Sequence, residues 1–589
     1  MTDVKPDDSH SAADVEHSEV TPKLSHDVEK SSSQEKPAAT SYIPQSDEEY
    51  DVTLKTWLVV FILSCSYGIS FWIVPALSPA VAIVATELGD ATKSAFFVST
   101  YLIAITITFM ICGANSDLFG RRWFIVGGNV LLFIGFIVGG TAKSNNGMIA
   151  AMALIGIGAG NSQLAAFALP ELLPNKWRPA AVVMADGVLF FTVLIGPVAG
   201  RWSGAHGHSW RWLFYAPAIA VFGSFVGLYL FYYPPKHPRG LPWNQALREL
   251  DYGGALLFIT STALILTGVN YTTIRKSSDP VVIGLLCSGF GTLVLFILYE
   301  TFMPLKQPLT PTRVFTRGKG RELTAPFVAA FVVTMFYYAI NIIYPTMINV
   351  FFSAEGDYKY QAVLTLPSNL GLILGAVLLT AFGLKIGHWR WTLTGSVFIM
   401  VFFGALLGVG TPERKGTMIA MVFIGQVGFG WAQYLSIAYV QFGCDQVELG
   451  ISGGLAGVAR FAGGAVAISV YTAILTNVQG NHMAKLVPPA AEAAGLPSSS
   501  VPALMAALPL GSAAIAQVPG ITTQIALAAA KAFQQSYVIG LRTTALSSLA
   551  FGIPAIIACI CCQDIDEKMT NKIEVFLEND KNADKNVYH

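Results

Sequence analysis

Apolar runs of about 20 residues alternate with short polar segments through most of the chain, and about 20 mostly apolar residues suffice for a helix to cross a bilayer. Fourteen runs reach this length. The pattern therefore predicts an all-α membrane protein with fourteen transmembrane helices. The expected spans lie near residues 56–78, 95–114, 123–142, 148–169, 181–200, 212–233, 252–271, 281–302, 324–350, 361–383, 391–410, 417–439, 453–476 and 538–562.

The arrangement of the spans predicts two six-helix bundles with two additional helices between them. Both ends of the chain are polar and offer little to bury, which is typical of disordered tails. The predicted parts are an N-terminal tail at 1–52, a first bundle at 53–235, two central helices with their linkers at 236–322, a second bundle at 323–563 and a C-terminal tail at 564–589.

The segment 477–535 is apolar enough to resemble a further pair of spans. However, Pro509, Gly511, Pro519 and Gly520 divide it into pieces too short to cross a bilayer. We therefore expect a long extracellular loop with short helices at the membrane interface, and an additional pair of spans is the alternative.

Composition supports the membrane assignment, because only 12% of the 589 residues are charged and 53% are apolar. A soluble domain usually has about 25% charged residues. Lys and Arg are more frequent in the even-numbered connections than in the short outer loops, which predicts that both termini are cytosolic. The 36 basic and 36 acidic residues balance, so no nucleic acid partner is expected.

The sequence GANSDLFGRRW, which begins at residue 113, forms the connection between the second and third spans. Gly113 and Gly120 permit a tight turn and close helix contact. Asp117 ends one span, and Arg121 and Arg122 begin the next, so their charges can form a latch that biases a conformational equilibrium. A solvated turn with ordinary positive-inside charges is the alternative, and the spacing favours neither.

Two other spans carry unusual residues. In GVLFFTVLIGPVAG of the fifth span, Gly187, Gly196 and Gly200 permit helices to touch, and Pro197 bends the helix. Arg460 lies well inside the thirteenth span. A charge at such a depth is costly unless it is paired or faces water, which makes Arg460 a functional candidate. A kinked packing helix is the alternative for the fifth span.

These segments resemble signatures of the major facilitator superfamily. GANSDLFGRRW is similar to its loop-two motif, and GPVAG in the fifth span is similar to its antiporter motif. The fourteen spans and the run RFAGG at 460–464 resemble the drug:proton antiporters with two extra central helices. LPELLPNKWRP and GRWSGAHGHSWRWLFY are similar to the fungal trichothecene efflux pump family, whose relatives include fungal siderophore transporters. The resemblance implies a major facilitator fold.

The chain departs from this family pattern at two places linked to proton coupling. Many members carry R-x-x-Q-G-x-G in the fourth span, where this chain has Met152 and Ile155 at the arginine and glutamine positions. Many fourteen-span exporters also carry an aspartate in the first span, which has no acidic residue here. These departures argue against coupling through the usual residues.

Three charged residues are candidates for proton coupling: Asp186, Glu171 and Arg460. Asp186 is the better carboxylate candidate, because it lies about 10 Å along its helix from Pro179 and burial disfavours its charged form. Glu171 ends the fourth span, and pairing with an arginine at the cytosolic face is the simpler expectation. Arg460 would act on a neighbouring acid that the sequence does not identify.

A substrate cavity is expected near the midplane between the two bundles. Polar and aromatic side chains inside apolar helices are its candidate lining, although each alone is more often a helix–helix hydrogen bond. As a set they suggest a cavity for a bulky amphipathic organic molecule. The candidates are Asn161, Gln163, Tyr337, Asn341, Tyr344, Gln426, Gln433 and Tyr434.

The leading hypothesis is a proton-coupled exporter of a small hydrophobic compound or toxin that works by alternating access. Uptake of a siderophore–iron complex by the same fold is the alternative, and a nutrient sensor that transports little is a third. The sequence shows no set of residues placed for catalysis or for binding a metal or a cofactor, so we expect that the protein is not an enzyme. We expect a monomer, with protons, a small molecule and the lipid bilayer as partners. The resemblance implies the plasma membrane.

Overall fold

The computed structural model describes residues 52–90, 93–205, 207–235, 242–272, 274–275, 278–352, 358–445, 448–510, 512–570, 573 and 575–580. All of them belong to one compact unit, Asp47–His589. Nearly all of the predicted N-terminal tail and the last nine residues, 581–589, lie outside the described residues.

Within the described ranges, thirteen helices are long and apolar enough to cross a membrane. A pair of helices bent by 43°, Pro179–Ala185 and Gly187–Ser203, provides a fourteenth span. The predicted all-α membrane fold with fourteen spans is confirmed. Several helices begin at side chains that bond the free amides of the first turn, as Thr53 does when its Oγ1 accepts from Thr56 N at 3.2 Å.

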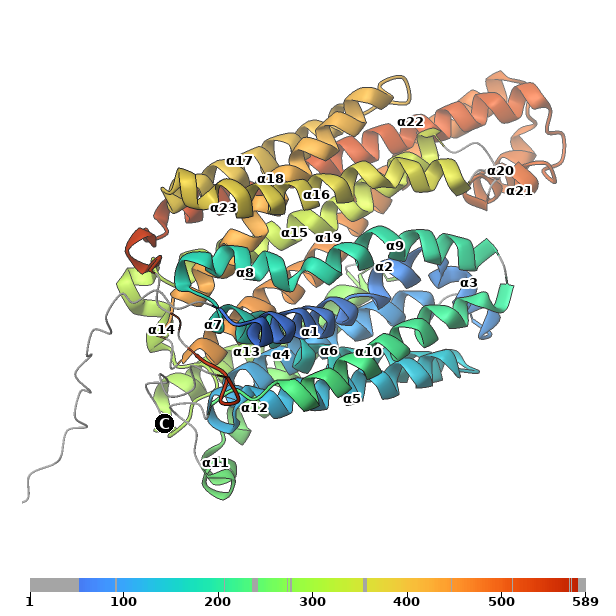
Figure 1. Cartoon of the computed structure of the whole chain (residues 1–589). Helices are drawn as coiled ribbons and strands as arrows, with labels where there is room; N and C mark the ends of the chain where they lie inside the picture. Colours follow the sequence, from blue (N-terminus) through green and yellow to red (C-terminus); the bar gives the residue numbers. More distant parts are fainter. Residues whose placement is uncertain are drawn as a thin grey trace, which may run out of the picture. The chain divides into compact units, whose positions relative to one another are not determined.

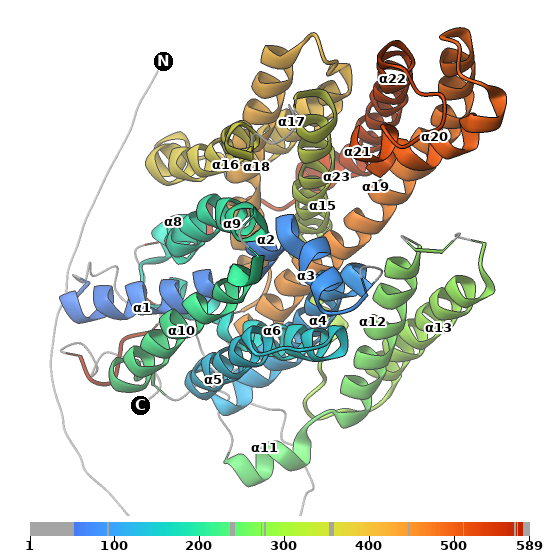
Figure 2. The same ribbon diagram turned by 90° about the vertical axis from the view of Figure 1, so that its right-hand side faces the viewer.

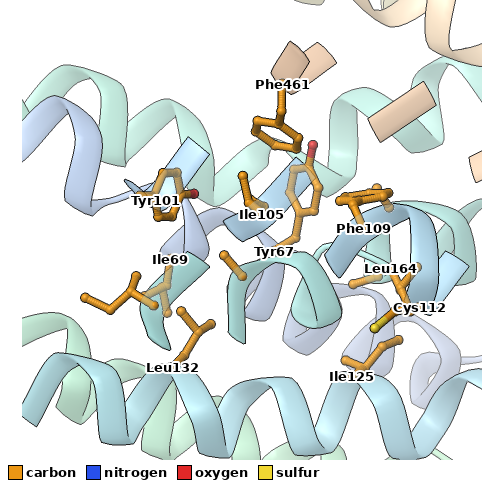
Figure 3. Packing of buried hydrophobic residues seen from close by; sticks show 14 of the residues in the cluster. Tyr67, Ile69, Tyr101, Ile105, Phe109, Cys112, Ile125, Leu132, Leu164 and Phe461 are labelled. Carbon is orange, nitrogen blue, oxygen red and sulfur yellow. The ribbon is translucent and has the colours of Figure 1, made fainter. Parts of the chain in front are cut away.

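The first set of helices surrounds one apolar cluster (Figure 1). Figure 3 shows part of this cluster, where Tyr67, Tyr101 and Phe109 lie near Phe461, which comes from a much later helix. The set consists of α1 (Leu54–Ser70), α2 (Ile73–Leu77), α3 (Val81–Glu87), α4 (Ser94–Phe119), α5 (Arg121–Gly140), α6 (Asn145–Ser162), α7 (Ala165–Glu171), α8 (Arg178–Ala185), α9 (Gly187–Ala205) and α10 (Trp212–Phe231).

The second set packs around a separate apolar cluster, and in Figure 1 its helices α16, α17, α18 and α22 lie above the first set. Its members are α15 (Thr324–Met347), α16 (Tyr358–Ile386), α17 (Trp389–Leu406), α18 (Lys415–Phe442), α19 (Leu449–Ala493), α20 (Val501–Ala507), α21 (Ser512–Ile515), α22 (Thr523–Ser547) and α23 (Leu549–Cys561).

The two additional helices, α12 (Tyr252–Tyr271) and α13 (Pro280–Phe302), form a hairpin that packs against α4. Figure 2 shows the hairpin beside α4, on the side away from α1. Asp251 caps α12 by accepting from Gly254 N at 2.7 Å, and Asp279 caps α13 by accepting from Val281 N at 2.9 Å. Short helices α11 (Trp243–Glu249) and α14 (Arg313–Thr316) lie in the linkers.

The segment 477–535 differs from the expected loop. α19 continues without interruption to Ala493, and α22 already begins at Thr523, so the two long helices extend beyond their apolar spans. They pack on each other and on the short helices α20 and α21 through a third apolar cluster. The short helices α20 and α21 lie between the two long helices, which is the part of the expectation that the structure reproduces.

The described part of the C-terminal tail packs against the helices instead of leaving them. We call residues 563–580 the strap. Ile565 and Leu577 are buried in the second and first apolar clusters, respectively. Gln563 N donates to Arg321 O at 3.1 Å before α15, and Val575 N donates to Glu171 O at 3.1 Å at the end of α7. The apolar residues of this otherwise polar segment explain why it binds both sets of helices.

Candidate functional site

We call the end of the helices that carries residues 113–122 the switch face, and the other end the opposite face. Asp117 is fully buried at the switch face. Both of its carboxylate oxygens lie 3.0 Å from Gly450 N, which donates to them from the first turn of α19. A carboxylate at this position also complements the positive end of the helix dipole. Asp117 therefore joins α4 to α19.

The buried Arg121 completes the latch. It lies 3.5 Å from Asp117 Oδ1 and forms a second ion pair with Glu171 at the end of α7. Glu171 thus has the arginine partner that the sequence favoured. Arg122 plays a different part, because it donates to Tyr229 O at 2.9 Å and stacks on the Tyr233 ring at 3.7 Å.

The two glycines of the loop-two motif are required for different structural reasons. A Cβ on Gly113 would lie 2.7 Å from Gly450 O, so only glycine lets α4 approach α19 closely enough for the latch. Gly120 has φ +83° and ends α4, a backbone conformation that favours glycine.

The fifth span is broken at Asp186, between α8 and α9. The Ser64 hydroxyl of α1 lies 2.9 Å from Met184 O and 3.0 Å from Ala185 O, so it bonds carbonyl groups at the break. Gly187 is not required for a close helix contact, in contrast to the expectation from the sequence, because a Cβ at this position would lie 3.6 Å from Ser64 Oγ, an ordinary van der Waals distance. The break places the Asp186 carboxyl group in the protein interior, where its side chain is 1% exposed.

The other residues of the antiporter motif bring α9 against α2. A Cβ on Gly200 would lie 2.1 Å from Ala76 O, and one on Gly196 would lie 3.2 Å from Ala76 N. Pro197 lies inside α9 and contributes to the wall of a cavity. The three residues therefore shape a tight helix contact next to that cavity.

Asp186 connects the two sets of helices through a polar cluster. Tyr434 on α18 donates to Asp186 Oδ2 at 2.6 Å, and Arg460 Nη2 on α19 lies 3.9 Å from the same oxygen. Arg460 also donates to the hydroxyl of Tyr67 on α1, and its guanidinium lies 4.9 Å from the Phe71 ring. The pairing supplies the acid for Arg460 that the sequence did not identify.

A cavity of about 830 Å³ lies between the two sets, next to this cluster. Arg460 and Tyr434, the partners of Asp186 on the second set, form part of its wall, whereas Asp186 is not among the described residues that line it. Among the predicted lining residues, the structure places Tyr337, Asn341, Tyr344, Gln433 and Tyr434 in the wall. This volume suits a drug-sized organic molecule.

The other three predicted lining residues are not among the described residues that form the cavity wall, although Ser368, the hydrogen-bond partner of Gln426, does line it. Asn161 donates to Ile157 O at 3.0 Å within its own helix. Gln163 donates to Ser70 Oγ at 2.9 Å, and Gln426 donates to Ser368 Oγ at 3.0 Å. The bonds of Gln163 and Gln426 join two membrane spans, which is the alternative that the sequence left open, whereas the bond of Asn161 lies within one helix.

Sequence reasoning missed Arg201, because the expected span ended one residue before it. The structure continues α9 to Ala205, which places Arg201 in the cavity wall. Asn369 of α16 and Asn270 of α12 were also missed. Each is an amide in an otherwise apolar helix, so the criterion that selected Asn341 applies equally to them.

Comparison with known proteins identifies the family of this chain. The family model for the fungal trichothecene efflux pump, TRI12, matches residues 41–589. The chain belongs to this family. It is therefore a membrane transporter of the major facilitator type and not an enzyme.

Individual relatives support the assignment. The MFS-type transporter prx5 of Penicillium rubens is 45% identical over 524 residues, covering 88% of this chain and 93% of the relative. The trichothecene efflux pump TRI12 of Fusarium sporotrichioides is 27% identical over 527 residues, covering 88% of each chain. The crystal structure of the human organic anion transporter MFSD10 has a TM-score of 0.50 and 14% identity, covering 71% of this chain and 93% of that one. This last likeness concerns the fold alone.

Proposed function

We propose that this member of the trichothecene efflux pump family exports a small hydrophobic organic compound in exchange for protons. The bundles 53–235 and 323–563 would alternate about the cavity, opening it to one face at a time. The observation that carries the proposal is the Asp186–Arg460–Tyr434–Tyr67 cluster, because it joins the bundles directly beside the cavity.

The cluster suggests how a proton is coupled to movement. Asp186 and Tyr67 belong to the first bundle, whereas Tyr434 and Arg460 belong to the second. When Asp186 is ionised, its attraction to Arg460 holds the bundles together at this depth. Protonation removes that attraction and lets the bundles separate at this depth. The protonation state of Asp186 would therefore decide which conformation the bundles adopt, so that the proton and the cargo cross to different faces at different steps of the cycle. This route replaces the residues missing from the first and fourth spans.

Export is the favoured direction because named relatives are efflux pumps. The same relatives give siderophore uptake no support. The proposed location is the plasma membrane with both termini in the cytosol, which makes the switch face the cytosolic one. The protein would act as a monomer, since the cavity and the cluster are built from a single chain.

Transport into membrane vesicles tests this proposal. A labelled trichothecene and a panel of small hydrophobic compounds would be supplied with and without an imposed pH gradient. We expect the gradient to drive accumulation of at least one compound. Arg460→Ala should abolish this transport while leaving the protein inserted in the membrane. Gradient-independent fluxes for the whole panel, or unchanged transport by the variant, would contradict the proposal.

A further inference from the structure

The cavity wall carries positive charge, and none of the described residues that line it is acidic. Among the described residues that line it, the two charged side chains are Arg201 and Arg460, and none is Asp or Glu. Arg460 is already bound to Asp186 and Tyr67, behind the wall. Arg201 is different, because its partner in the cavity is the neutral side-chain oxygen of Gln361 on α16.

Arg201 still has capacity to bind a ligand. A guanidinium has five N–H donors. Arg201 Nε is buried and has no hydrogen-bond partner among the described residues. Arg201 is one of the described residues in the wall, next to the space that cargo would occupy.

The remainder of the wall suits an amphipathic molecule. The Tyr337 and Phe429 rings stack with 5.2 Å between centroids, and Phe71 and Phe461 add further apolar surface. The side chains of Asn341 and other amides supply neutral hydrogen-bonding groups. The apolar body of a ligand would thus contact aromatic rings, while a guanidinium selects the charge of its polar end.

From this arrangement we propose that the cargo is an amphipathic organic acid whose carboxylate or equivalent anion binds Arg201. The inference rests on the proposed function and narrows its cargo from small hydrophobic compounds to acidic ones. A carboxylate matches the forked donors of arginine. An ammonium group would meet two guanidinium groups and no acid in the described wall, so amines should be rejected.

Binding measurements with matched probes test the inference. The full chain in phosphatidylcholine nanodiscs would be dialysed against 1-naphthylacetic acid, 1-naphthaleneacetamide or 2-(1-naphthyl)ethylamine at about pH 7.5, where the acid is ionised. Empty nanodiscs give the background. We expect the acid to bind at least about tenfold more tightly than the amide of the same shape, and the amine most weakly. Equal retention of acid and amide, including no binding of either, would overturn the inference.

Variants test whether Arg201 causes the preference for the acid. Arg201→Gln should remove the preference for the acid, and Arg201→Lys should restore part of it. Arg275→Gln is the matched control, because Arg275 is also at the opposite face but pairs with Asp279 in the α12–α13 linker. It should keep the full preference. An acid preference that survives Arg201→Gln would overturn the assignment.

A final control concerns Glu355 and Asp357, which precede α16 in the sequence and lie outside the described residues. The double variant E355Q/D357N should leave the preference unchanged. A rise in acid binding would mean that one of these carboxylates normally occupies Arg201, and would overturn the inference. None of these measurements uses a pH gradient, so proton coupling and cargo charge succeed or fail separately.

Discussion

At the scale of single residues, the latch at the switch face depends on Asp117. Its carboxylate accepts a hydrogen bond from Gly450 N and lies beside Arg121. Asp117→Ala therefore leaves the first turn of α19 uncapped and removes one carboxylate partner of the buried Arg121. Removing one partner of a buried ion pair costs about 3 kcal/mol or more. We expect a clear fall in the midpoint of thermal unfolding and faster hydrogen exchange at the start of α19.

Arg122→Gln is the control for this prediction. Arg122 belongs to the same motif but packs on Tyr233, and a partly exposed cation–π contact contributes only about 1 kcal/mol. If Asp117→Ala were no less stable than Arg122→Gln, the latch would have no role in holding α4 to α19.

Residue chemistry was predictable where a side chain is unusual for its surroundings. Asp186 and Arg460 stand out because each is charged within an apolar span. Their pairing was not predictable, because it depends on how α8, α9 and α19 pack. Gln163 and Gln426 show the converse, since an amide in a helix has the same sequence signal whether it faces a cavity or Ser70 or Ser368.

At the scale of elements, the contact between α9 and α2 gives a sharp packing prediction. A Cβ on Gly200 would lie 2.1 Å from Ala76 O, so Gly200→Ala must push the two helices apart. Overpacking of this kind typically costs about 1–3 kcal/mol. Gly223→Ala on α10 is the control, because a Cβ there meets nothing within 4 Å. Equal midpoints of thermal unfolding for the two variants would contradict the described contact.

The strap should hold the switch face closed, because it bonds both helix sets. Cys444 reports on this face: burial raises the pKa of its thiol to about 12, so very little reactive thiolate is present near pH 8. Deleting residues 564–589 should open the face and return the pKa of Cys444 toward its ordinary range. Maleimide labelling of Cys444 near pH 8 should then rise about tenfold or more.

The strap measurement requires a chain in which the exposed Cys287 and Cys561 are replaced by serine. Labelling should also rise with pH in the undeleted chain, because the thiol ionises only as the pH approaches its raised pKa. Equal labelling rates with and without residues 564–589 would show that the strap does not close this face.

Element prediction succeeded for the spans and failed at their ends. Twenty apolar residues identify a span, as about 20 residues cross a bilayer, but hydropathy does not report where a helix stops in water. α19 continues to Ala493 because Met483 and Val487 pack on residues of α20 and α22, contacts between segments far apart in the chain. Hydropathy also misplaced the end of α9, which continues to Ala205, and Arg201 was therefore missed.

At the scale of the whole molecule, the sequence motifs and span count predicted the major facilitator fold, and the family comparison confirmed it. The proposed transport cycle requires two bundles that move as units around the cavity. One ionisable contact, between Asp186 and Arg460, would then bias the whole transition, because the rest of the interface between the bundles responds to the same movement.

A distance measurement between the two bundles is the sharpest test of this coupling. Spin labels would replace Lys143, in the α5–α6 turn, and Glu413, in the α17–α18 turn, which are both exposed at the opposite face. Cys287 and Cys561 would again be serine. Double electron–electron resonance would then record the distance distribution across a range of pH in the wild-type background and in Asp186→Asn.

We expect a second distance population to appear in the wild-type background as the pH falls, because protonation releases Asp186 from Arg460. Asp186→Asn, which cannot ionise, should show the same distribution at every pH. A pH-dependent shift that persists in Asp186→Asn, or a single unchanging distance in the wild-type background, would rule out control of the bundles by this ion pair.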